Sequence, residues 1–207
     1  PCIDTNYYET FNRENVSLVN LRRTPIDTIT EKGIKTSDIE REFDAIIFAT
    51  GFDALTGSIL KLNITGKKGI NLSKFWSKGP KSFLGLLVPN FPNLFIVSGP
   101  GSPSVLTNVP VQIEQHVNWI TNCIKYLEKN RKKSIETTNL AAKKWQKEIM
   151  NSVKKTLFMK AKSSWYKGDN IPGKPKTFLP YPGGMPKYKS ECIKVEKNNY
   201  KELKISK

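Results

Sequence analysis

The order of hydrophobic and polar residues predicts short strands near the start of the chain. Val16–Asn20, Ile26–Thr30 and Ile34–Thr36 are short runs rich in β-branched residues, and Glu31-Lys32-Gly33 has the composition of a turn. Short runs separated by turn residues are typical of antiparallel strands. We therefore predict a small β-meander in this region.

Two longer hydrophobic runs each end at a glycine. Phe43–Ala49 is almost continuously apolar and stops at Thr50 and Gly51, and Asn93–Ser98 stops at Gly99. Both runs are typical of strands that are buried on both faces of an α/β sheet. Such sheets bind ligands at the carboxyl ends of their strands, so Thr50 and Gly51 are candidates for a ligand site. The same two residues also fit a plain turn.

The spacing of apolar residues changes to a helical period from Pro110 onward. One amphipathic helix is predicted over about 110–130, from the spacing of Ile113, Val117, Ile120, Ile124 and Leu127. A second is predicted over about 138–160, with many lysines on its polar face, from the spacing of Ala141, Trp145, Ile149, Val153 and Leu157.

Two segments rich in glycine and proline are candidates for binding loops. Gly99–Ser104 precedes the first helix, where backbone N–H groups could bind an anion or a carbonyl oxygen. It lacks the third glycine of a dinucleotide fingerprint, and its two prolines remove amide donors. The segment from Ser163 to about 175 contains Trp165, which could stack on an aromatic ligand or pack under the loop. The only histidine, His116, fits a structural or surface role in the first helix better than a catalytic one.

Composition excludes several other classes of protein. The chain has 207 residues with no apolar run near the roughly 18 residues that a membrane-spanning helix needs. Cys2, Cys123 and Cys192 are far apart and odd in number, and only one His accompanies them, which argues against a disulfide framework and against a metal site. We expect a cytoplasmic protein without a membrane partner. The last dozen residues are polar and have a composition typical of disorder.

The net charge of +16 is concentrated in the last third of the chain. Residues 1–60 carry 6 basic and 10 acidic side chains, residues 61–130 carry 8 and 2, and residues 131–207 carry 20 and 6. Of the 34 basic residues 29 are Lys, whereas bases and phosphates are gripped bidentately by Arg. No nucleic-acid-binding motif accompanies the charge, so nucleic acid is not the expected partner.

Read together, the motifs resemble those of one enzyme family. They are Asp4–Arg13, Ala49–Ala54, Gly79-Pro80 with Phe83–Gly85, Phe91–Phe95, Gly99–Ser104, Ile113–His116, Ser164–Tyr166 and Asn170–Pro175. In this order they are similar to the C-terminal part of the flavin-dependent Baeyer–Villiger monooxygenases, over residues 1 to about 192. The resemblance implies an α/β fold, the C-terminal portion of a flavoprotein with two Rossmann-like dinucleotide-binding domains, here with a β-meander and long helices.

The resemblance also implies the reaction and its cofactors. Members of this family use NADPH and FAD to insert one oxygen atom from O2 next to a ketone carbonyl, which gives an ester or a lactone. The family's two GxGxxG fingerprints and its FxGxxxHxxxWP signature are absent from this sequence. Its catalytic arginine belongs to a Lys-Arg pair that we expect immediately before Pro1, so no catalytic residue is assigned within the chain. We expect a fragment that cannot bind FAD or turn over alone.

Individual residues take roles by their match to the family. Thr50 and Gly51 match a strand end beside the dinucleotide sites. Pro103, Ser104, Val105 and Leu106 match the loop that shapes the substrate pocket. Asn108 and Val109 match the backbone near the flavin ring, and Trp165 matches a loop tryptophan that contacts NADP.

The same resemblance predicts the domain boundaries. Residues 1–45 would end the NADP-binding domain and form the meander, and residues 46–162 would be the C-terminal part of the FAD-binding domain. Residues 163–192 would form the cofactor and substrate loop with a C-terminal segment, followed by a polar tail over 193–207. Two other functions stay open: a flavin monooxygenase that oxidises nitrogen or sulfur, and a basic binding module without enzymatic activity.

Overall fold

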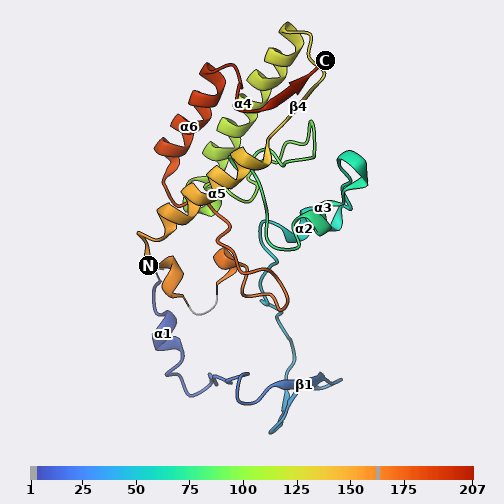
Figure 1. The fold of residues 1–207 in the computed structure, drawn as a ribbon. Coiled ribbons are helices and arrows are strands. Elements are labelled where there is room, and N and C mark those ends of the chain that lie inside the picture. The colour runs from blue at the N-terminus through green and yellow to red at the C-terminus, as the bar shows by residue number, and fades with distance from the viewer. Residues whose placement is uncertain (1–3, 162–163) are drawn as a thin grey trace. The chain divides into compact units, whose positions relative to one another are not determined.

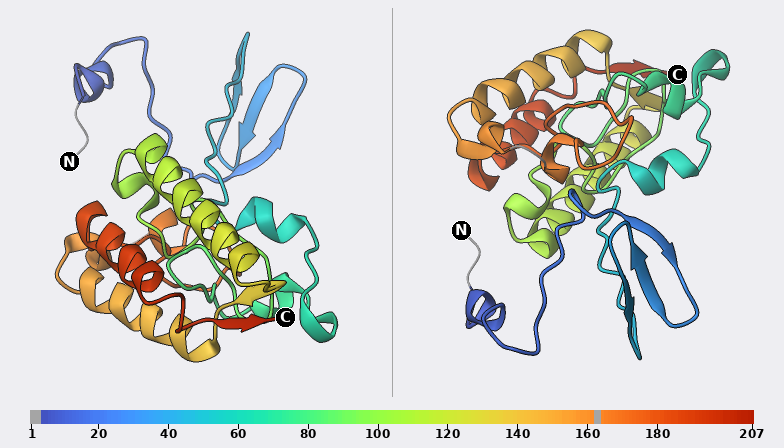
Figure 2. Two further views of the ribbon diagram at one scale, coloured as in Figure 1. Left: turned by 90° about the horizontal axis from the view of Figure 1, so that it is seen from above. Right: turned by 90° about the horizontal axis from the view of Figure 1, so that it is seen from below.

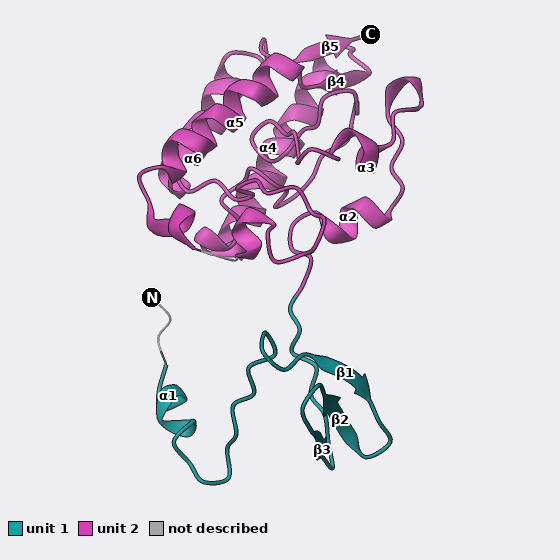
Figure 3. Cartoon of the chain, turned by 60° about the horizontal axis from the view of Figure 1, so that its bottom comes forward, with its two compact units in different colours: residues 1–51 teal, residues 52–207 magenta. Residues whose placement is uncertain are grey.

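The chain is divided into two compact units, residues 1–51 and residues 52–207 (Figure 3). The structure is a computed structural model that describes residues 4–161 and 164–207. This division lies close to the predicted boundary between residues 45 and 46, while the assignment of each part to a cofactor domain stays a prediction.

Unit 1 contains a short helix and a three-stranded antiparallel sheet. The helix is α1 (Tyr7–Thr10), and the sheet has the order β1 (Ile26–Ile29), β2 (Gly33–Thr36) and β3 (Glu40–Glu42). Gly33 lets β2 and β3 approach closely, because a Cβ there would lie 2.0 Å from the carbonyl oxygen of Arg41. The meander is confirmed, but its third strand is β3, and the predicted strand at residues 16–20 is wrong.

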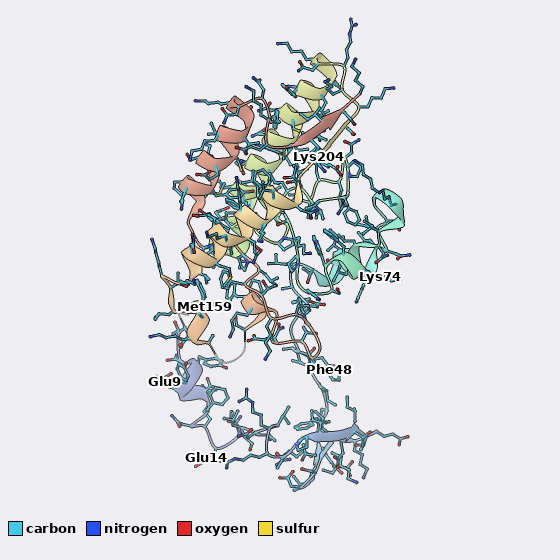
Figure 4. All side chains as sticks on the ribbon, in the orientation of Figure 1. Glu9, Glu14, Phe48, Lys74, Met159 and Lys204 are labelled. Carbon is cyan, nitrogen blue, oxygen red and sulfur yellow. The ribbon has the colours of Figure 1, made fainter. Side chains whose placement is uncertain are left out.

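The apolar runs that were predicted as buried strands form no strand. Residues 43–51 of unit 1 have no regular structure, and Ile47 and Phe48 are 91% and 66% exposed. Figure 4 labels Phe48 on this segment. In unit 2 the run that ends at Gly99 makes one isolated bridge, between Phe95 and Leu87. A strand that is buried on both faces needs neighbouring strands and covering helices. In the described part of unit 1, β1 to β3 pair only with one another.

Unit 2 is built from helices and loops with one small sheet. Its α-helices are α2 (Gly57–Lys61), α3 (Leu72–Phe75), α4 (Val109–Lys129), α5 (Asn139–Val153) and α6 (Met185–Lys197). Its 3₁₀ helices are η1 (Lys67–Gly69), η2 (Ser104–Leu106), η3 (Leu157–Lys160) and η4 (Trp165–Lys167), and its strands are β4 (Ser134–Glu136) and β5 (Lys204–Ser206). The three long helices lie side by side (Figures 1 and 2). None of the described helices is long and apolar enough to span a membrane.

The two predicted helices are confirmed, and side-chain caps fix where they begin. The Asn108 side chain accepts a hydrogen bond from the N–H of Val111 at 3.3 Å, and the Thr138 side chain accepts one from Ala141 at 3.0 Å. The second helix ends at Val153, earlier than predicted. There the hydroxyl of Thr156 donates to the carbonyl oxygen of Val153, and the chain continues into η3.

The buried face of α4 is displaced by one residue from the predicted apolar face. The fully or almost fully buried residues of α4 are Gln112, His116, Trp119, Cys123 and Leu127. Of the residues expected on the apolar face, only Leu127 is buried, and Ile113, Val117 and Ile124 are about 40% exposed. The indole of Trp119 fixes this rotation of the helix, because it is buried against α6 and donates to the carbonyl oxygen of Cys192 at 3.0 Å.

The end of the chain is part of the core of unit 2. The side chains of Tyr188 and Cys192 on α6 are buried, as are Tyr200 and Leu203 beyond it. Strand β5 pairs with β4, with Ile205 opposite Ile135. The predictions of a disordered end and of a polar tail over 193–207 are therefore wrong. Buried apolar side chains in this segment pack into the core in spite of its many lysines.

Candidate functional site

The loop that was predicted to bind a ligand is buried and held by α4. Every residue from Gly99 to Ser104 is buried. The amide nitrogen of Gln112 donates to the hydroxyl oxygens of Ser98 and Ser102 at 3.2 and 3.1 Å. The hydroxyl of Ser102 in turn donates to the carbonyl oxygen of Gly99 at 2.7 Å. A polar residue of α4 thus holds the residue that precedes the loop and a residue within it.

His116 extends this hydrogen-bond network from the loop to α6. Its Nδ1 accepts from the backbone N–H of Ser98 at 3.0 Å, so the ring proton lies on Nε2. Nε2 lies 2.8 Å from the hydroxyl oxygen of Tyr188, and that hydroxyl donates to the carbonyl oxygen of Leu84 at 2.6 Å. Burial lowers the pKa of His116 to about 4. The imidazole is therefore neutral at pH 7, and the histidine has the structural role that the sequence favoured.

Close packing of the backbone leaves no ligand space inside the loop. Gly85 has φ +69°, and a Cβ there would lie 2.4 Å from the amide nitrogen of Ser102. The loop amides also have partners within the protein, since the N–H of Gly101 donates to Leu179 at 2.6 Å and that of Ser102 donates to Gly99 at 3.1 Å. The indole of Trp145 donates to the carbonyl oxygen of Gly101 at 2.9 Å. An anion site made by the amides of Gly101 and Ser102 is therefore excluded.

The residues predicted to line the substrate pocket lie where this packed loop meets η2. Pro103 and Ser104 are buried, and Ser104 has φ +51° at the start of η2. Leu106 packs against the main core, whereas Val105 is 48% exposed. Among these residues Val105 is the one whose side chain is available to a ligand at the surface of unit 2. Asn108 and Val109 follow directly as the cap and first residue of α4.

Trp165 lies on a second loop and packs against an aromatic neighbour. Its ring is stacked on Tyr166, with ring centres 4.1 Å apart and planes 24° apart. The side chain of Ser164 caps η4 by accepting from the N–H of Tyr166 at 3.2 Å. Ser163, the first residue of the predicted loop, lies outside the described residues. Trp165 is partly exposed, which leaves part of its ring accessible.

Residues 177–181 join the two candidate loops through backbone hydrogen bonds. On one side the N–H of Leu179 donates to Tyr166 at 2.7 Å. On the other side the N–H of Tyr181 donates to Ser102 at 2.7 Å, and Leu179 accepts from Gly101 at 2.6 Å. The structure thus brings the predicted substrate loop and the predicted NADP loop into one assembly.

Thr50 and Gly51 belong to unit 1, whereas the two candidate loops belong to unit 2. Both are exposed. Gly51 has φ +83°, and a Cβ at this position would meet no atom within 4 Å. The glycine therefore serves the backbone conformation there rather than a close contact within unit 1.

Known proteins show which family has this arrangement. No family model matches the chain. The cyclohexanone 1,2-monooxygenase of Acinetobacter sp. is 42% identical over 206 residues, which are 99% of this chain and 37% of that protein. The solved complex of OTEMO with FAD and NADP is 37% identical with a TM-score of 0.89, over 99% of this chain and 37% of that one. The phenazine N-monooxygenase PhzNO1 of Lysobacter antibioticus is 38% identical, over 97% of this chain and 37% of that protein.

The chain is homologous to the C-terminal part of the Baeyer–Villiger monooxygenases. It spans about 37% of the length of the curated relatives it matches. The match covers unit 1 and unit 2 alike, including both candidate loops and the segment that joins them. The mixed helix and strand content agrees with this family of FAD- and NADP-dependent flavoproteins, and so does the likeness to their solved structures.

The residues that build the loop support in this Baeyer–Villiger homologue were mostly missed from the sequence. They are Ser98, Gln112 and Tyr188, together with His116, which is hydrogen-bonded to Ser98 and to Tyr188. A signal for two of them was present, because Gln112 and His116 continue the helical spacing of Trp119, Cys123 and Leu127. Their side chains are polar, so the spacing of apolar residues alone does not mark them. Tyr188 was missed with the whole of α6.

Proposed function

We propose that this chain supplies the substrate loop and the NADP loop of an NADPH- and FAD-dependent Baeyer–Villiger monooxygenase. The substrate would be a small ketone, and the product an ester or a lactone carrying one oxygen atom from O2. The joining of the two loops through residues 177–181 supports this proposal most directly, because the family reaction needs the ketone and the nicotinamide cofactor at one site. Homology over 99% of the chain favours an enzyme over a basic binding module.

The residues of the chain fit one part of the cofactor environment. The first turn of α4 begins at an exposed Asn108, and a long helix presents partial positive charge at such an end. We propose that Asn108 and Val109 lie beside the flavin ring there and favour its anionic reduced form. FAD would supply the chemistry that activates O2. The packed loop before α4 does not fit the phosphates of either cofactor, because its amides at Gly101 and Ser102 are already bonded within the protein.

The other site residues keep their proposed roles. Val105 would face the ketone from an exposed position, while Pro103, Ser104 and Leu106 would hold it there from buried or partly buried positions. Trp165 would contact NADP through the part of its ring that Tyr166 leaves uncovered. Thr50 and Gly51 would lie beside the dinucleotide sites. Cys123 and Cys192 are free, buried thiols, which supports action in the reducing cytoplasm.

Exposed apolar side chains in both units support the proposal that further parts of the enzyme pack against this chain. The half-exposed face of α4 includes Ile113, Val117 and Ile124, and unit 1 exposes Ile47 and Phe48. Apolar surface of this kind marks an interaction site or a missing cover. We propose that the flavoprotein portion present in the relatives, outside the matched 37%, covers it. The 207-residue chain alone should therefore copurify with no stoichiometric FAD, which its absorption spectrum would show.

A chimera tests the proposed activity. The 206 matched residues of the Acinetobacter cyclohexanone monooxygenase would be replaced by this chain. We expect the chimera to bind FAD and to form a lactone from cyclohexanone with NADPH, measured by gas chromatography. A chimera that binds FAD and oxidises NADPH, yet forms no ester or lactone from any of a panel of ketones, would contradict the proposal. The unmodified host enzyme is the control.

Oxidation of nitrogen is a second candidate, favoured by the similarity to the phenazine N-monooxygenase. The same chimera would be offered phenazines and amines. An N-oxide formed in place of ketone oxidation would select this candidate over the first. We favour ketones because the cyclohexanone 1,2-monooxygenase is more similar, at 42% identity against 38%.

A further inference from the structure

Asn170 and Lys174, which have no proposed role, contact residues 52–54 in unit 2. The amide nitrogen of Asn170 donates to the carbonyl oxygen of Phe52 at 3.4 Å. The ammonium of Lys174 donates to the carbonyl oxygen of Ala54 at 3.2 Å and forms a hydrogen-bonded ion pair with the carboxylate of Asp53. Within the part of the chain that the structure describes, these are the side-chain hydrogen bonds that join residues 169–175 to residues 52–54.

The local structure is shaped for the Lys174–Asp53 pair. Only 11% of the Lys174 side chain is exposed, against 40% for Asp53. The stem of Lys174 passes over Gly168, where a Cβ would lie 3.4 Å from its Cε. On the other side the carboxylate of Asp53 packs against Gly57, where a Cβ would lie 2.6 Å from the Cγ of Asp53. Gly57 therefore leaves the space that the Asp53 carboxylate occupies, whereas a Cβ at Gly168 would be in ordinary van der Waals contact with the lysine stem.

The rest of the loop is fastened at its base rather than at its tip. The N–H of Leu179 bonds to Tyr166, and the N–H of Thr177 bonds to Lys167 at 2.9 Å. The ion pair between Lys167 and Asp169, at 2.9 Å, lies within the loop itself. Residues 170–174, at the far end of the loop, are therefore held mainly by the ion pair of Lys174 with Asp53. Because the lysine side chain is mostly buried, this charge-assisted hydrogen bond is stronger than an exposed ion pair.

We propose that Lys174 and Asp53 form a latch that holds the loop of residues 164–175 in one position and thereby positions Trp165. The effect of the latch on NADP rests on the proposed function, because the latch would act on the cofactor only through Trp165. Lys174 and Asp53 are positioning residues in this proposal. Neither needs to touch a cofactor or a substrate.

Hydrogen exchange on the full 207-residue chain tests the latch without any cofactor. We expect Lys174→Met and Asp53→Asn each to accelerate amide exchange in peptides that cover residues 164–175 by about 10-fold, the loss expected for one charge-assisted hydrogen bond. Exchange within α4 should stay unchanged, which shows that the variants are folded. The conservative variant Lys174→Arg should retain most of the protection.

A double variant separates a latch from two independent effects. Because the two residues act through each other, Lys174→Met with Asp53→Asn should exchange no faster than either single variant. Single effects that multiply in the double variant would overturn the proposal. The matched control is Lys187→Met, which breaks the ion pair between Lys187 and Glu148 elsewhere in unit 2 and should leave exchange in residues 164–175 unchanged. Equal acceleration by Lys187→Met would also overturn it.

The chimera described above tests the consequence for the reaction. We expect both single variants to raise the KM for NADPH about 10-fold with a smaller change in kcat, and to retain FAD. Accelerated exchange with an unchanged KM for NADPH would overturn the role in positioning Trp165. Should the chimera be inactive, the proposed function fails, while hydrogen exchange still decides whether the latch exists.

Discussion

The two apolar runs that end at glycine have the same pattern in the sequence and different surroundings in the structure. The run before Gly51 lies exposed in unit 1, whereas the run before Gly99 leads into a loop that is buried and hydrogen-bonded in unit 2. The difference lies in partners that are distant in sequence. Gln112, His116 and Trp145 hold the second segment, and no described residue of unit 1 covers Ile47 or Phe48. A hydrophobic run therefore indicates a segment that burial would stabilise. Whether the segment is buried depends on residues elsewhere in the chain.

The largest contrast is expected between alanine at Gly85 and alanine at Gly51. Their φ angles are similar, +69° and +83°, but a Cβ at Gly85 would lie 2.4 Å from a backbone nitrogen, while one at Gly51 would touch nothing. Gly85→Ala should destabilise unit 2 by about 3 kcal/mol through strain and overpacking. Urea unfolding followed by tryptophan fluorescence measures this, because all four tryptophans lie in unit 2. Gly51→Ala should leave that transition unchanged, and equal shifts would contradict the contrast.

Acid should loosen the buried loop of unit 2. Burial lowers the pKa of His116 from 6.5 to about 4, so the unfolded chain binds the proton first as the pH falls. The stability of unit 2 should be complete above about pH 6.5 and should fall by up to about 3 kcal/mol on approaching pH 4. Urea unfolding at several pH values would measure it. His116→Gln removes the only histidine, and an equally steep loss in that variant would assign the effect to other groups.

A smaller effect is expected when the hydroxyl of Tyr188 is removed. Tyr188→Phe keeps the ring packed but leaves the carbonyl oxygen of Leu84 and the Nε2–H of His116 without a partner. We expect a loss of about 2 kcal/mol, measured by the same urea unfolding. Tyr126→Phe is a suitable control, because Tyr126 is only partly buried and its hydroxyl has no hydrogen bond to a protein group in the described residues. Equal losses in the two variants would show that the network adds nothing.

The smallest effect should come from the exposed run. Phe48→Ser changes a side chain that is 66% exposed, so the stability of the isolated chain should change by less than about 0.5 kcal/mol. In the chimera the same change should lower the FAD content, because the proposed cover would pack on Phe48. The ratio of flavin absorbance to protein absorbance measures this. An unaltered ratio would argue that Phe48 stays exposed there too.

The local sequence pattern predicts where α4 and α5 begin, but it does not predict which face of α4 is buried. The helical spacing predicted from Pro110 and from Thr138 lies within one residue of the starts of α4 and α5. The buried face of α4 differs by one residue because it is chosen by contacts with α6 and with the loop from Ser98, which no local pattern records. Helix α6 had a usable signal in the spacing of Tyr188, Cys192 and Val195, but its lysines concealed it.

The sequence predicts the two candidate loops but not the contacts between them. The resemblance marks the loop around Ser104 and the loop around Trp165 as two separate segments. Their connection through residues 177–181, and the latch of Lys174 on Asp53, depend on hydrogen bonds between segments far apart in the chain. Such bonds are fixed by the fold as a whole.

The burial of Tyr200 and Leu203, together with the pairing of β5 with β4, also sets the timing of folding during synthesis. A ribosome adds residues from the N-terminus and covers the most recently made part of the chain. Unit 2 cannot close its core until residues 200–206 have left the ribosome. Until then α4 exposes the side chains of Trp119 and Tyr126 that Tyr200 packs against, so the nascent chain is open to chaperones and proteases in that interval.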